Sequence, residues 1–409
     1  MRQFTEYPPL SLYVHFPWCI KKCPYCDFNS HTVRNEIPEQ QYLNAVVADL
    51  ELHAPDIWGR SVGSVFFGGG TPSLMSAAGM EFLMSRIRSI VKLEPNAEIT
   101  LEANPGAINQ DRFSAYQQAG VNRLSIGVQS FNPIHLQALG RIHSSDDAAN
   151  AVVSARQAGF ENFNLDLMHG LPGQTARHAC DDINAALELA PSHISYYQLT
   201  LEPNTLFAAR PPELPGEETL WDIQQQGKQL LADAGYRQYE VSAYARDNRQ
   251  CQHNLNYWLF GDYLGIGAGA HSKLTFPAHN SIVRHSKRKQ PADYMRTADT
   301  PDRIQGQREL GLDDTRLEFM MNALRLNDGF QTADFLSRTG EDIDPLKATI
   351  DTLETDGLLT RTPFSVAPTD NGLRYLDSVL EKFLPDAADN SYATKETRVI
   401  PIINSDHSA

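Results

Sequence analysis

Positive charge and long apolar runs are both scarce in this sequence. Lys and Arg number 35 against 50 Asp and Glu, which gives a net charge of −15. Because phosphate binding depends on clustered positive charge, this balance disfavours a nucleic-acid partner. No apolar run approaches the roughly 20 residues that a membrane span needs, and no basic segment followed by an apolar one marks the N-terminus. We therefore expect a soluble, cytoplasmic protein.

Cysteine is rare as well. The 409 residues contain five cysteines, and three of them, Cys19, Cys23 and Cys26, lie within eight positions. An odd number with this spacing disfavours a disulfide framework and indicates a set of ligands. Cys180 lies in a predicted helix, and we expect it to be a core residue.

Short β-branched or aromatic runs alternate with amphipathic helical stretches over the first half of the chain. This alternation predicts six βα units and a parallel sheet, and the fold that we expect is an incomplete parallel (β/α)6 barrel. The six predicted strands span residues 10–16, 64–67, 99–102, 123–128, 162–167 and 194–199.

Polar residues and glycines follow several of these predicted strands. In α/β barrels the carboxyl ends of the strands form the edge where the chemistry lies. We therefore expect one rim to bring together the cysteine loop with Gly69, Gly70, Thr71, Glu102, Gln129 and Asp166.

The pattern changes after about residue 205, where Pro and Gly mark a boundary. We expect a barrel core over residues 1–240 and a connector rich in Gly, His and aromatic residues over 241–305. Three helical patterns and a small hairpin over 306–384 look like a winged-helix module, with a structural or docking role favoured over DNA binding by the acidic balance. Residues 385–409 have few apolar anchors and are expected to be disordered.

The three clustered cysteines put three thiolates on one tight loop. A four-iron cluster held by three cysteines leaves one iron free for another ligand. A structural zinc ion is an alternative, because His15 or His31 could supply a fourth ligand, and reduced thiols without a ligand are another. The spacing favours a [4Fe-4S] cluster.

This motif resembles the radical S-adenosylmethionine superfamily. Within it, segments 12–19, 68–72, 127–131 and 166–173 are similar to the branch that contains oxygen-independent coproporphyrinogen III oxidases and the haem chaperones. The resemblance covers most of the chain. It implies a radical-S-adenosylmethionine barrel that binds a [4Fe-4S] cluster, with S-adenosylmethionine on the open iron.

The resemblance also implies roles that the residue chemistry supports. A glycine loop lets the backbone approach the methionine amino group, carboxylates accept bonds from amine or ribose hydroxyls, and a guanidinium can fork onto a carboxylate. The contacts to S-adenosylmethionine expected in this way are Tyr13, Tyr25, Phe28, Gly69, Gly70, Thr71, Glu102, Gln129, Arg141 and Asp166.

Position 28 separates the two functions known in this branch. The oxidases carry a further Cys two residues after the third cluster ligand, whereas this chain has Phe28, within a Cys-Asp-Phe-Asn-Ser segment that looks like the haem chaperones. The 18 residues before Cys19 also leave little room for the N-terminal extension of the oxidases. A radical decarboxylase acting on porphyrinogen propionates stays the alternative function. A radical enzyme acting on RNA or protein is disfavoured by the acidic charge.

A second motif, His253-Asn-Leu-Asn-Tyr257-Trp258, resembles the His-Asn-x-x-Tyr-Trp segment of the haem chaperones. His is a usual axial ligand of haem iron, and Tyr and Trp offer flat apolar faces to a macrocycle. Cys251 and His271 are further candidates by chemistry alone. We expect His253 to bind haem iron, with Tyr257 and Trp258 beside the macrocycle.

Taken together, these features predict a protein that binds haem and transfers it to acceptor haemoproteins, respiratory ones among them. The favoured role is not enzymatic, and the cluster with its S-adenosylmethionine has a structural, regulatory or redox-gating part. A homodimer and a loose membrane contact through a membrane-bound acceptor are both compatible with the sequence.

Overall fold

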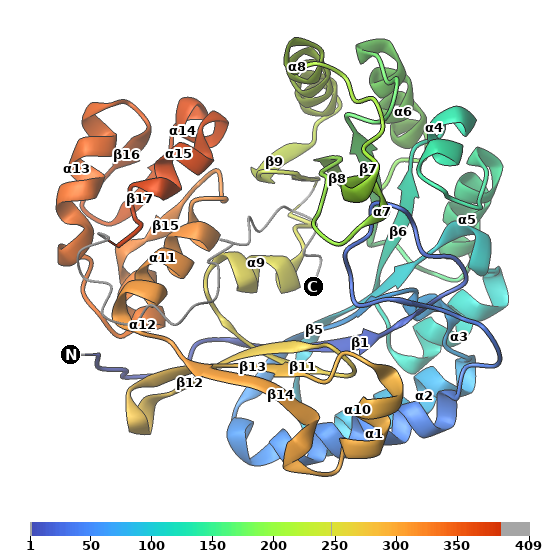
Figure 1. The fold of residues 1–409 in the computed structure, drawn as a ribbon, viewed down its shortest axis with the longest axis horizontal. Coiled ribbons are helices and arrows are strands. Elements are labelled where there is room, and N and C mark those ends of the chain that lie inside the picture. The colour runs from blue at the N-terminus through green and yellow to red at the C-terminus, as the bar shows by residue number, and fades with distance from the viewer. Residues whose placement is uncertain (1, 247, 386–409) are drawn as a thin grey trace.

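The computed structural model describes residues 2–246 and 248–385, and its main feature is one curved sheet of twelve strands (Figure 1). The order across the sheet is β14-β13-β12-β11-β1-β4-β5-β6-β7-β8-β10-β9. The strands are β1 (Leu10–Phe16), β4 (Ser61–Gly69), β5 (Lys92–Ala103), β6 (Arg123–Gln129), β7 (Phe163–His169), β8 (His193–Gln198), β9 (Arg237–Glu240), β10 (Ala243–Ala245), β11 (Asp262–Ile266), β12 (His271–Phe276), β13 (Ser281–Lys287) and β14 (Ile304–Glu309).

The central strands of this sheet are parallel, as the sequence predicts. Strands β1, β4, β5, β6, β7 and β8 coincide with the six predicted runs and pair in parallel. A seventh parallel strand, β11, pairs with β1 so that Leu12 faces Leu264. It lies in the segment 241–305 that the sequence presents as a connector, which also contributes β10, β12 and β13 to the sheet in antiparallel pairings. The predicted fold class is confirmed, with a sheet wider than expected.

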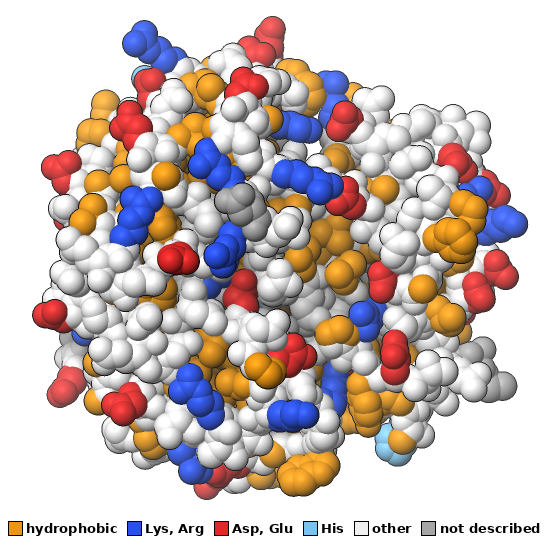
Figure 2. Space-filling view, turned by 180° about the vertical axis from the view of Figure 1, so that it is seen from behind, with side chains coloured by type: hydrophobic (Ala, Val, Ile, Leu, Met, Phe, Trp, Pro, Cys, Tyr) orange, Lys and Arg blue, Asp and Glu red, His pale blue; other side chains and the backbone are white. Residues whose placement is uncertain are grey.

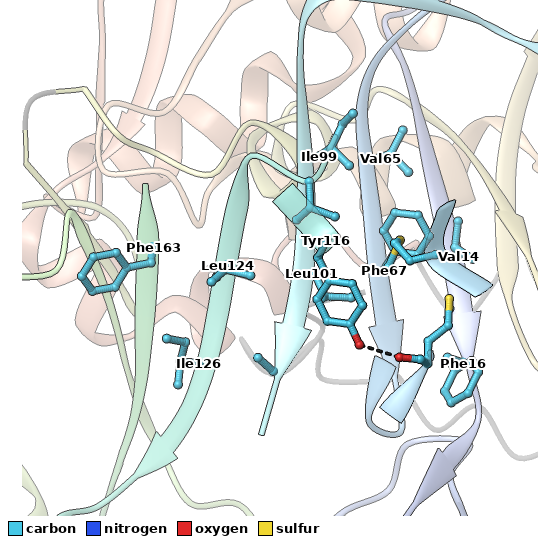
Figure 3. Packing of buried hydrophobic residues seen from close by; sticks show 14 of the residues in the cluster. Val14, Phe16, Val65, Phe67, Ile99, Leu101, Tyr116, Leu124, Ile126 and Phe163 are labelled. Atoms are coloured by element: carbon cyan, nitrogen blue, oxygen red, sulfur yellow. Dashed lines mark hydrogen bonds between the residues drawn. The ribbon is translucent and has the colours of Figure 1, made fainter. Parts of the chain in front are cut away.

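Helices cover the outer face of the parallel strands (Figure 1). The apolar side chains that meet them alternate along each strand, as Val14 and Phe16, Val65 and Phe67, and Ile99 and Leu101 do (Figure 3). This period of two leaves the intervening residues of each strand for the inside of the barrel. The outer helices are α1 (Glu39–His53), α2 (Ala77–Ile90), α3 (Gln110–Ala119), α5 (Ser145–Gln157), α6 (Ala176–Glu188) and α8 (Glu217–Asp233).

A helical C-terminal region lies beside the barrel and has its own apolar core, around Phe319, Phe335 and Leu353 (Figure 1). Three helices pack with a small sheet of order β15-β17-β16, whose strand β15 precedes the second helix, and two short helices end the region. Its elements are α11 (Leu312–Ala323), β15 (Phe330–Gln331), α12 (Thr332–Thr339), α13 (Lys347–Thr355), β16 (Leu359–Arg361), β17 (Ser365–Pro368), α14 (Asp370–Arg374) and α15 (Leu376–Glu381). Residues 386–409, expected to be disordered, lie outside the described residues.

A short helix, α9 (Gln252–Trp258), lies between the barrel and the C-terminal region (Figure 1). On one side it packs against β1, β4 and β11, and on the other against α11. The contact with the C-terminal region includes an ion pair between Arg325 and Glu240 at 3.1 Å and the Arg325 guanidinium 4.4 Å from the Trp258 ring. The second predicted motif therefore lies at the junction of the two parts.

The antiparallel extension of the sheet is fastened to α1 by a buried charge network. The carboxylate of Asp49 is fully buried and accepts bonds from Lys287 at 2.5 Å, Arg303 at 2.9 Å and the hydroxyl of Tyr294 at 2.8 Å. A buried ion pair of this kind must be fully satisfied to be tolerated. Asp49 thus holds the edge of the sheet that starts from β11 against the first helix of the barrel.

The surface carries both signs of charge. Figure 2 shows Lys and Arg side chains interspersed with Asp and Glu on one face of the molecule. Of the helices that the structure describes, none is both long and apolar enough to cross a bilayer.

Candidate functional site

One cavity at the carboxyl ends of the strands gathers most of the predicted site residues. Its volume is about 1380 Å³ with its open mouth included. Tyr13, His253, Tyr257 and Trp258 are not among its lining residues. The predicted residues that line it are Cys19, Cys23, Cys26, Tyr25, Phe28, Gly69, Gly70, Thr71, Glu102, Gln129, Arg141 and Asp166.

Contacts within the chain hold the cysteine loop in shape. Two short strands, β2 (Trp18–Cys19) and β3 (His31–Thr32), pair at its base. The ammonium group of Lys22 donates to the carbonyls of Phe28 at 3.0 Å and Ser30 at 3.3 Å, which closes the loop from inside. The chain is therefore folded so that the three thiols face the same cavity.

Two observations bear on what these thiols hold. Among the residues that the structure describes, no three His, Cys, Asp or Glu side chains lie close enough together to hold one metal ion. His15, a candidate fourth zinc ligand, has both ring nitrogens hydrogen-bonded, Nδ1 to the Tyr13 hydroxyl and Nε2 to the Asn29 carbonyl, each at 2.9 Å. Three thiols on the wall of a wide cavity fit a cluster that offers each of them a separate iron.

Burial opposes ionisation of two of the three thiols. Burial raises the pKa of Cys19, and it raises the pKa of Cys26 to about 11. The Arg141 guanidinium donates to the sulfur of Cys23 at 3.8 Å. Loading of iron must therefore release protons, as is usual when thiols become metal ligands.

The glycines after β4 are required by close packing against the cysteine loop. Gly69 has φ +116°, and a Cβ there would lie 2.6 Å from the His15 ring. A Cβ on Gly70 would lie 2.7 Å from the carbonyl oxygen of Trp18. The Gly69 N–H donates to Glu102 at 3.1 Å, so the loop also fixes this carboxylate at the rim. Only residues without side chains let the strands β1 and β4 meet at this edge.

The ends of β6 and β7 supply the amide and the second carboxylate. Gln129 has φ +68°, a conformation that costs a non-glycine residue about 1–3 kcal/mol, and its Oε1 accepts from Tyr197 at 2.7 Å. Asp166 accepts from Asn164 at 2.7 Å and from Ser125 at 3.1 Å. Burial raises the pKa of Asp166 while these donors oppose the shift. The strained Gln129 and the buried carboxylate are held in place by partners inside the barrel.

Sequence reasoning missed these partners. Ser125, Asn164, His193 and Ser195 all line the cavity from the inner faces of their strands. The signal that could have found them is the period of two, since Asn164 stands two positions before Asp166 on the same face of β7.

His253, on α9, has no solvent exposure and does not line this cavity, although its neighbours Cys251 and Asn254 do. Ser64 donates to Ser11 at 2.8 Å, so its oxygen accepts from Nδ1 of His253 at 2.9 Å. Within the described residues, Nε2 has no hydrogen-bond partner. The ring stacks on Phe66 with 5.0 Å between centroids, and burial followed by the charge of Arg123 lowers its pKa to about 3. His253 is a neutral imidazole whose Nε2 carries a free lone pair.

The other residues of the second motif and its alternatives have different surroundings. Tyr257 is half-buried, with its ring 4.3 Å from that of Tyr263, and Trp258 is buried under Arg325. Cys251 is buried, and its thiol donates to Glu98 at 3.5 Å. His271 is exposed on β12.

Tyr13, expected to touch a nucleoside, lies between the two groups of predicted residues. Its hydroxyl is bonded to His15, and its ring lies 6.4 Å from that of Phe66 and 6.5 Å from that of His253. It connects the base of the cysteine loop to the surroundings of α9.

Comparisons with known proteins agree with this geometry. Residues 13–186 match the radical SAM superfamily, and residues 310–375 match the HemN C-terminal domain. Among solved structures, the radical SAM enzyme coproporphyrinogen III oxidase (HemN) from Escherichia coli superposes with a TM-score of 0.78 at 26% identity, over 92% of this chain and 90% of that one. Membership of the radical SAM superfamily implies an iron–sulfur cluster and S-adenosylmethionine.

Two curated relatives match almost the whole chain. The "Heme chaperone HemW" of Escherichia coli K12 is 48% identical over 93% of this chain and 100% of its own length. The protein of the same name from Haemophilus influenzae is 49% identical over 93% of this chain and 99% of its own length. The chain therefore belongs to the HemW family of the radical SAM superfamily.

Proposed function

We propose that this protein is a haem chaperone that binds haem through His253 and transfers it to acceptor haemoproteins. It carries a [4Fe-4S] cluster on Cys19, Cys23 and Cys26, with exchangeable S-adenosylmethionine. Relatives of nearly full length that are named heme chaperones support this proposal.

One observation about the site carries the proposal: the free Nε2 of His253. A buried polar atom without a partner is costly, and an imidazole nitrogen with a lone pair is a usual ligand of haem iron. The hydrogen bond to Ser64 fixes the tautomer that leaves this lone pair on Nε2. The rings of Phe66 and Tyr257 supply an apolar setting for a macrocycle.

Haem reaches this nitrogen only if the junction opens. The His253 side chain has no exposed surface, and α9 is covered by the C-terminal region through the contacts of Arg325 with Glu240 and Trp258. We infer that the C-terminal region moves away from α9 when haem binds. Opening of this kind would also give a route for transfer to an acceptor.

The rim holds the other two groups. The three cysteines would bind the cluster, which supplies an open coordination position and an electron. The backbone after Gly69 and the carboxylate of Glu102 are suited to the methionine amino group, and Arg141 to its carboxylate. Asp166 and Gln129 would bond the ribose hydroxyls, with Tyr25 and Phe28 beside the nucleoside.

The test is an anaerobic haem titration of the cluster-loaded protein, followed by Soret absorbance. Wild type is expected to bind haem stoichiometrically, whereas His253→Ala loses the specific spectrum because the unpartnered imidazole nitrogen at the junction is removed. His271→Ala is the matched control, since His271 is exposed on β12 and should leave binding unchanged. Loss of haem binding in the His271 variant alone would identify His271 as the residue that binds the haem iron. Absence of specific binding in wild type would end the proposal.

The structural likeness to coproporphyrinogen III oxidase favours one alternative, a radical decarboxylase. In this function a 5′-deoxyadenosyl radical abstracts hydrogen from a porphyrinogen propionate. Phe28 stands where the oxidases have a further Cys, which counts against it. Decarboxylated porphyrinogen accumulating in an anaerobic assay of the reconstituted protein would favour the alternative.

The remaining partners are proposed because they follow from a role in haem delivery. The acceptors include respiratory haemoproteins, and a membrane-bound acceptor would bring the protein into loose membrane contact. A homodimer stays part of the proposal. The cytoplasm is the proposed compartment, because it keeps cysteine thiols reduced.

A further inference from the structure

An unbroken series of hydrogen bonds crosses the barrel from Asp166 to the start of α9. Asp166 accepts from the amide nitrogen of Asn164 at 2.7 Å, and Oδ1 of Asn164 lies 2.7 Å from Nδ1 of His193. Nε2 of His193 lies 2.9 Å from the hydroxyl of Tyr239, which accepts from the backbone N–H of Cys251 at 3.2 Å. We call these five residues the interior chain.

Every bond of the interior chain points the same way. An ionised carboxylate can only accept, so the amide nitrogen of Asn164 faces Asp166 and its oxygen accepts from Nδ1 of His193, which leaves Nε2 of a neutral His193 as an acceptor. The hydroxyl of Tyr239 therefore donates to Nε2 of His193, and Nδ1–H of His193 donates to Asn164. This requires a neutral His193, and burial lowers the pKa of His193 well below its usual value.

The surroundings make these bonds strong. Asn164, His193 and Tyr239 are 1–3% exposed, so water does not compete for their polar atoms. In such a site, hydrogen bonds that point in one direction polarise and strengthen one another. A change in the charge or position of the Asp166 carboxylate therefore alters the strength of each following hydrogen bond.

The two ends of the interior chain both border the cavity of the rim, and the Cys251 end also begins α9. Asp166 lines the cavity of the rim, and so do Asn164 and His193. Cys251 immediately precedes α9, which carries His253 two positions later. The start of α9 is also held by Glu98, which accepts from the N–H of His253 at 3.2 Å. Tyr239 and Glu98 thus set the position of the helix that bears the free Nε2.

We propose that Tyr239 and His193 are positioning residues that couple occupancy of the S-adenosylmethionine site to the order of α9. The inference rests on the proposed function, in which Asp166 contacts S-adenosylmethionine and His253 binds haem. A hydroxyl group of the ligand that donates to Asp166 fixes its carboxylate, and the bonds that follow hold α9 more firmly. By thermodynamic linkage, a ligand on α9 must in turn alter the affinity for S-adenosylmethionine.

The experiment is amide hydrogen exchange of residues 251–258 in cluster-loaded protein, with and without S-adenosylmethionine. In wild type the ligand is expected to slow this exchange severalfold. Tyr239→Phe keeps the ring but removes the hydroxyl, so the ligand should no longer change the exchange. His193→Phe breaks the interior chain at the next position and should behave alike, and thermal unfolding verifies that each variant is folded.

Tyr236→Phe is the matched control. Tyr236 is buried nearby, and its hydroxyl donates to the carbonyl of Pro191 outside the interior chain. This variant should keep the wild-type response. The coupling is refuted if S-adenosylmethionine leaves α9 unchanged in wild type, or if the response is the same in Tyr239→Phe.

This measurement needs no haem, so it separates the two claims. Haem binding without any effect of S-adenosylmethionine on α9 would keep the chaperone proposal and remove the coupling. An effect of S-adenosylmethionine on α9 without specific haem binding would end the chaperone proposal and keep the coupling between the cofactor site and α9. As a second readout, haem should raise the affinity for S-adenosylmethionine in wild type, and this ratio should fall to one in Tyr239→Phe.

Discussion

The rim with the three cysteines and the junction with His253 meet solvent in different ways. At the rim, Cys23, Cys26 and Arg141 are partly exposed and share an open cavity that both polar and apolar side chains line. At the junction, His253 has no exposed surface and stacks on Phe66. An open cavity suits a small ligand that exchanges freely, whereas a closed apolar setting suits a large flat ligand admitted by movement. One barrel therefore combines a rim cavity that is accessible to a ligand with a junction that must open before His253 can bind one.

The strongest test of this separation removes the cluster alone. Cys23→Ser should abolish the iron content and the cluster absorbance, because three thiolates are the minimum set on this loop. Haem binding to His253 should persist, since the junction does not contain Cys23. Cys180→Ser, on α6 and outside the cavity, should retain the iron. Simultaneous loss of haem binding in Cys23→Ser would mean that the two sites are not separate.

A smaller effect is expected from the carboxylate at the rim. Glu102→Gln removes the charge that would bind an ammonium group, and charge-assisted bonds contribute about 1.5–3 kcal/mol, or roughly ten- to hundredfold in affinity. Equilibrium binding of S-adenosylmethionine should weaken by this amount, while the Soret titration in the absence of S-adenosylmethionine stays the same. Glu202→Gln, a second carboxylate on the cavity wall, should alter the affinity much less. Equal losses in both variants would assign the effect to the charge of the cavity as a whole.

The closed state of the junction predicts a dependence of stability on pH. Burial lowers the pKa of His253 from 6.5 to about 3 in the folded protein. Between these values the unfolded chain binds the proton and the folded protein does not, so stability falls as the pH drops below 6.5, by up to about 1.4 kcal/mol per unit. Urea unfolding at pH 7 and pH 5 should show a smaller loss in His253→Gln than in wild type. Identical losses would mean that His253 is not kept neutral by the fold.

The smallest effect concerns the contact that closes the junction. Arg325→Ala removes the ion pair with Glu240 and the stacking on Trp258, so haem should associate severalfold faster in stopped-flow absorbance. Arg237→Ala is the control, because the ion pair of Arg237 with Asp328 is exposed and such pairs contribute little. An unchanged rate in Arg325→Ala would place the route of haem elsewhere.

Sequence reasoning was strongest where the signal is local. The six parallel strands, the cysteine loop and the glycines before Thr71 were predicted because each is encoded within a few neighbouring residues. Strand β11 was not, since its five residues lie in a glycine-rich segment and pair with β1 some 250 positions earlier. The interior chain was missed for the same reason, because Asn164, His193 and Tyr239 come from three different strands.

The sequence by itself determined which groups can act as ligands and which of them lie together along the chain. Three thiols within eight residues must lie near one another in any fold, because the backbone between them is short. The tertiary structure decided the rest. Curvature of the sheet brings Asp166 and α9 to the two ends of one line of hydrogen bonds, and packing of α9 against β1 and β4 buries His253. Distances between residues far apart in sequence are set by how strands pair and helices pack, and no short segment of the chain contains that information.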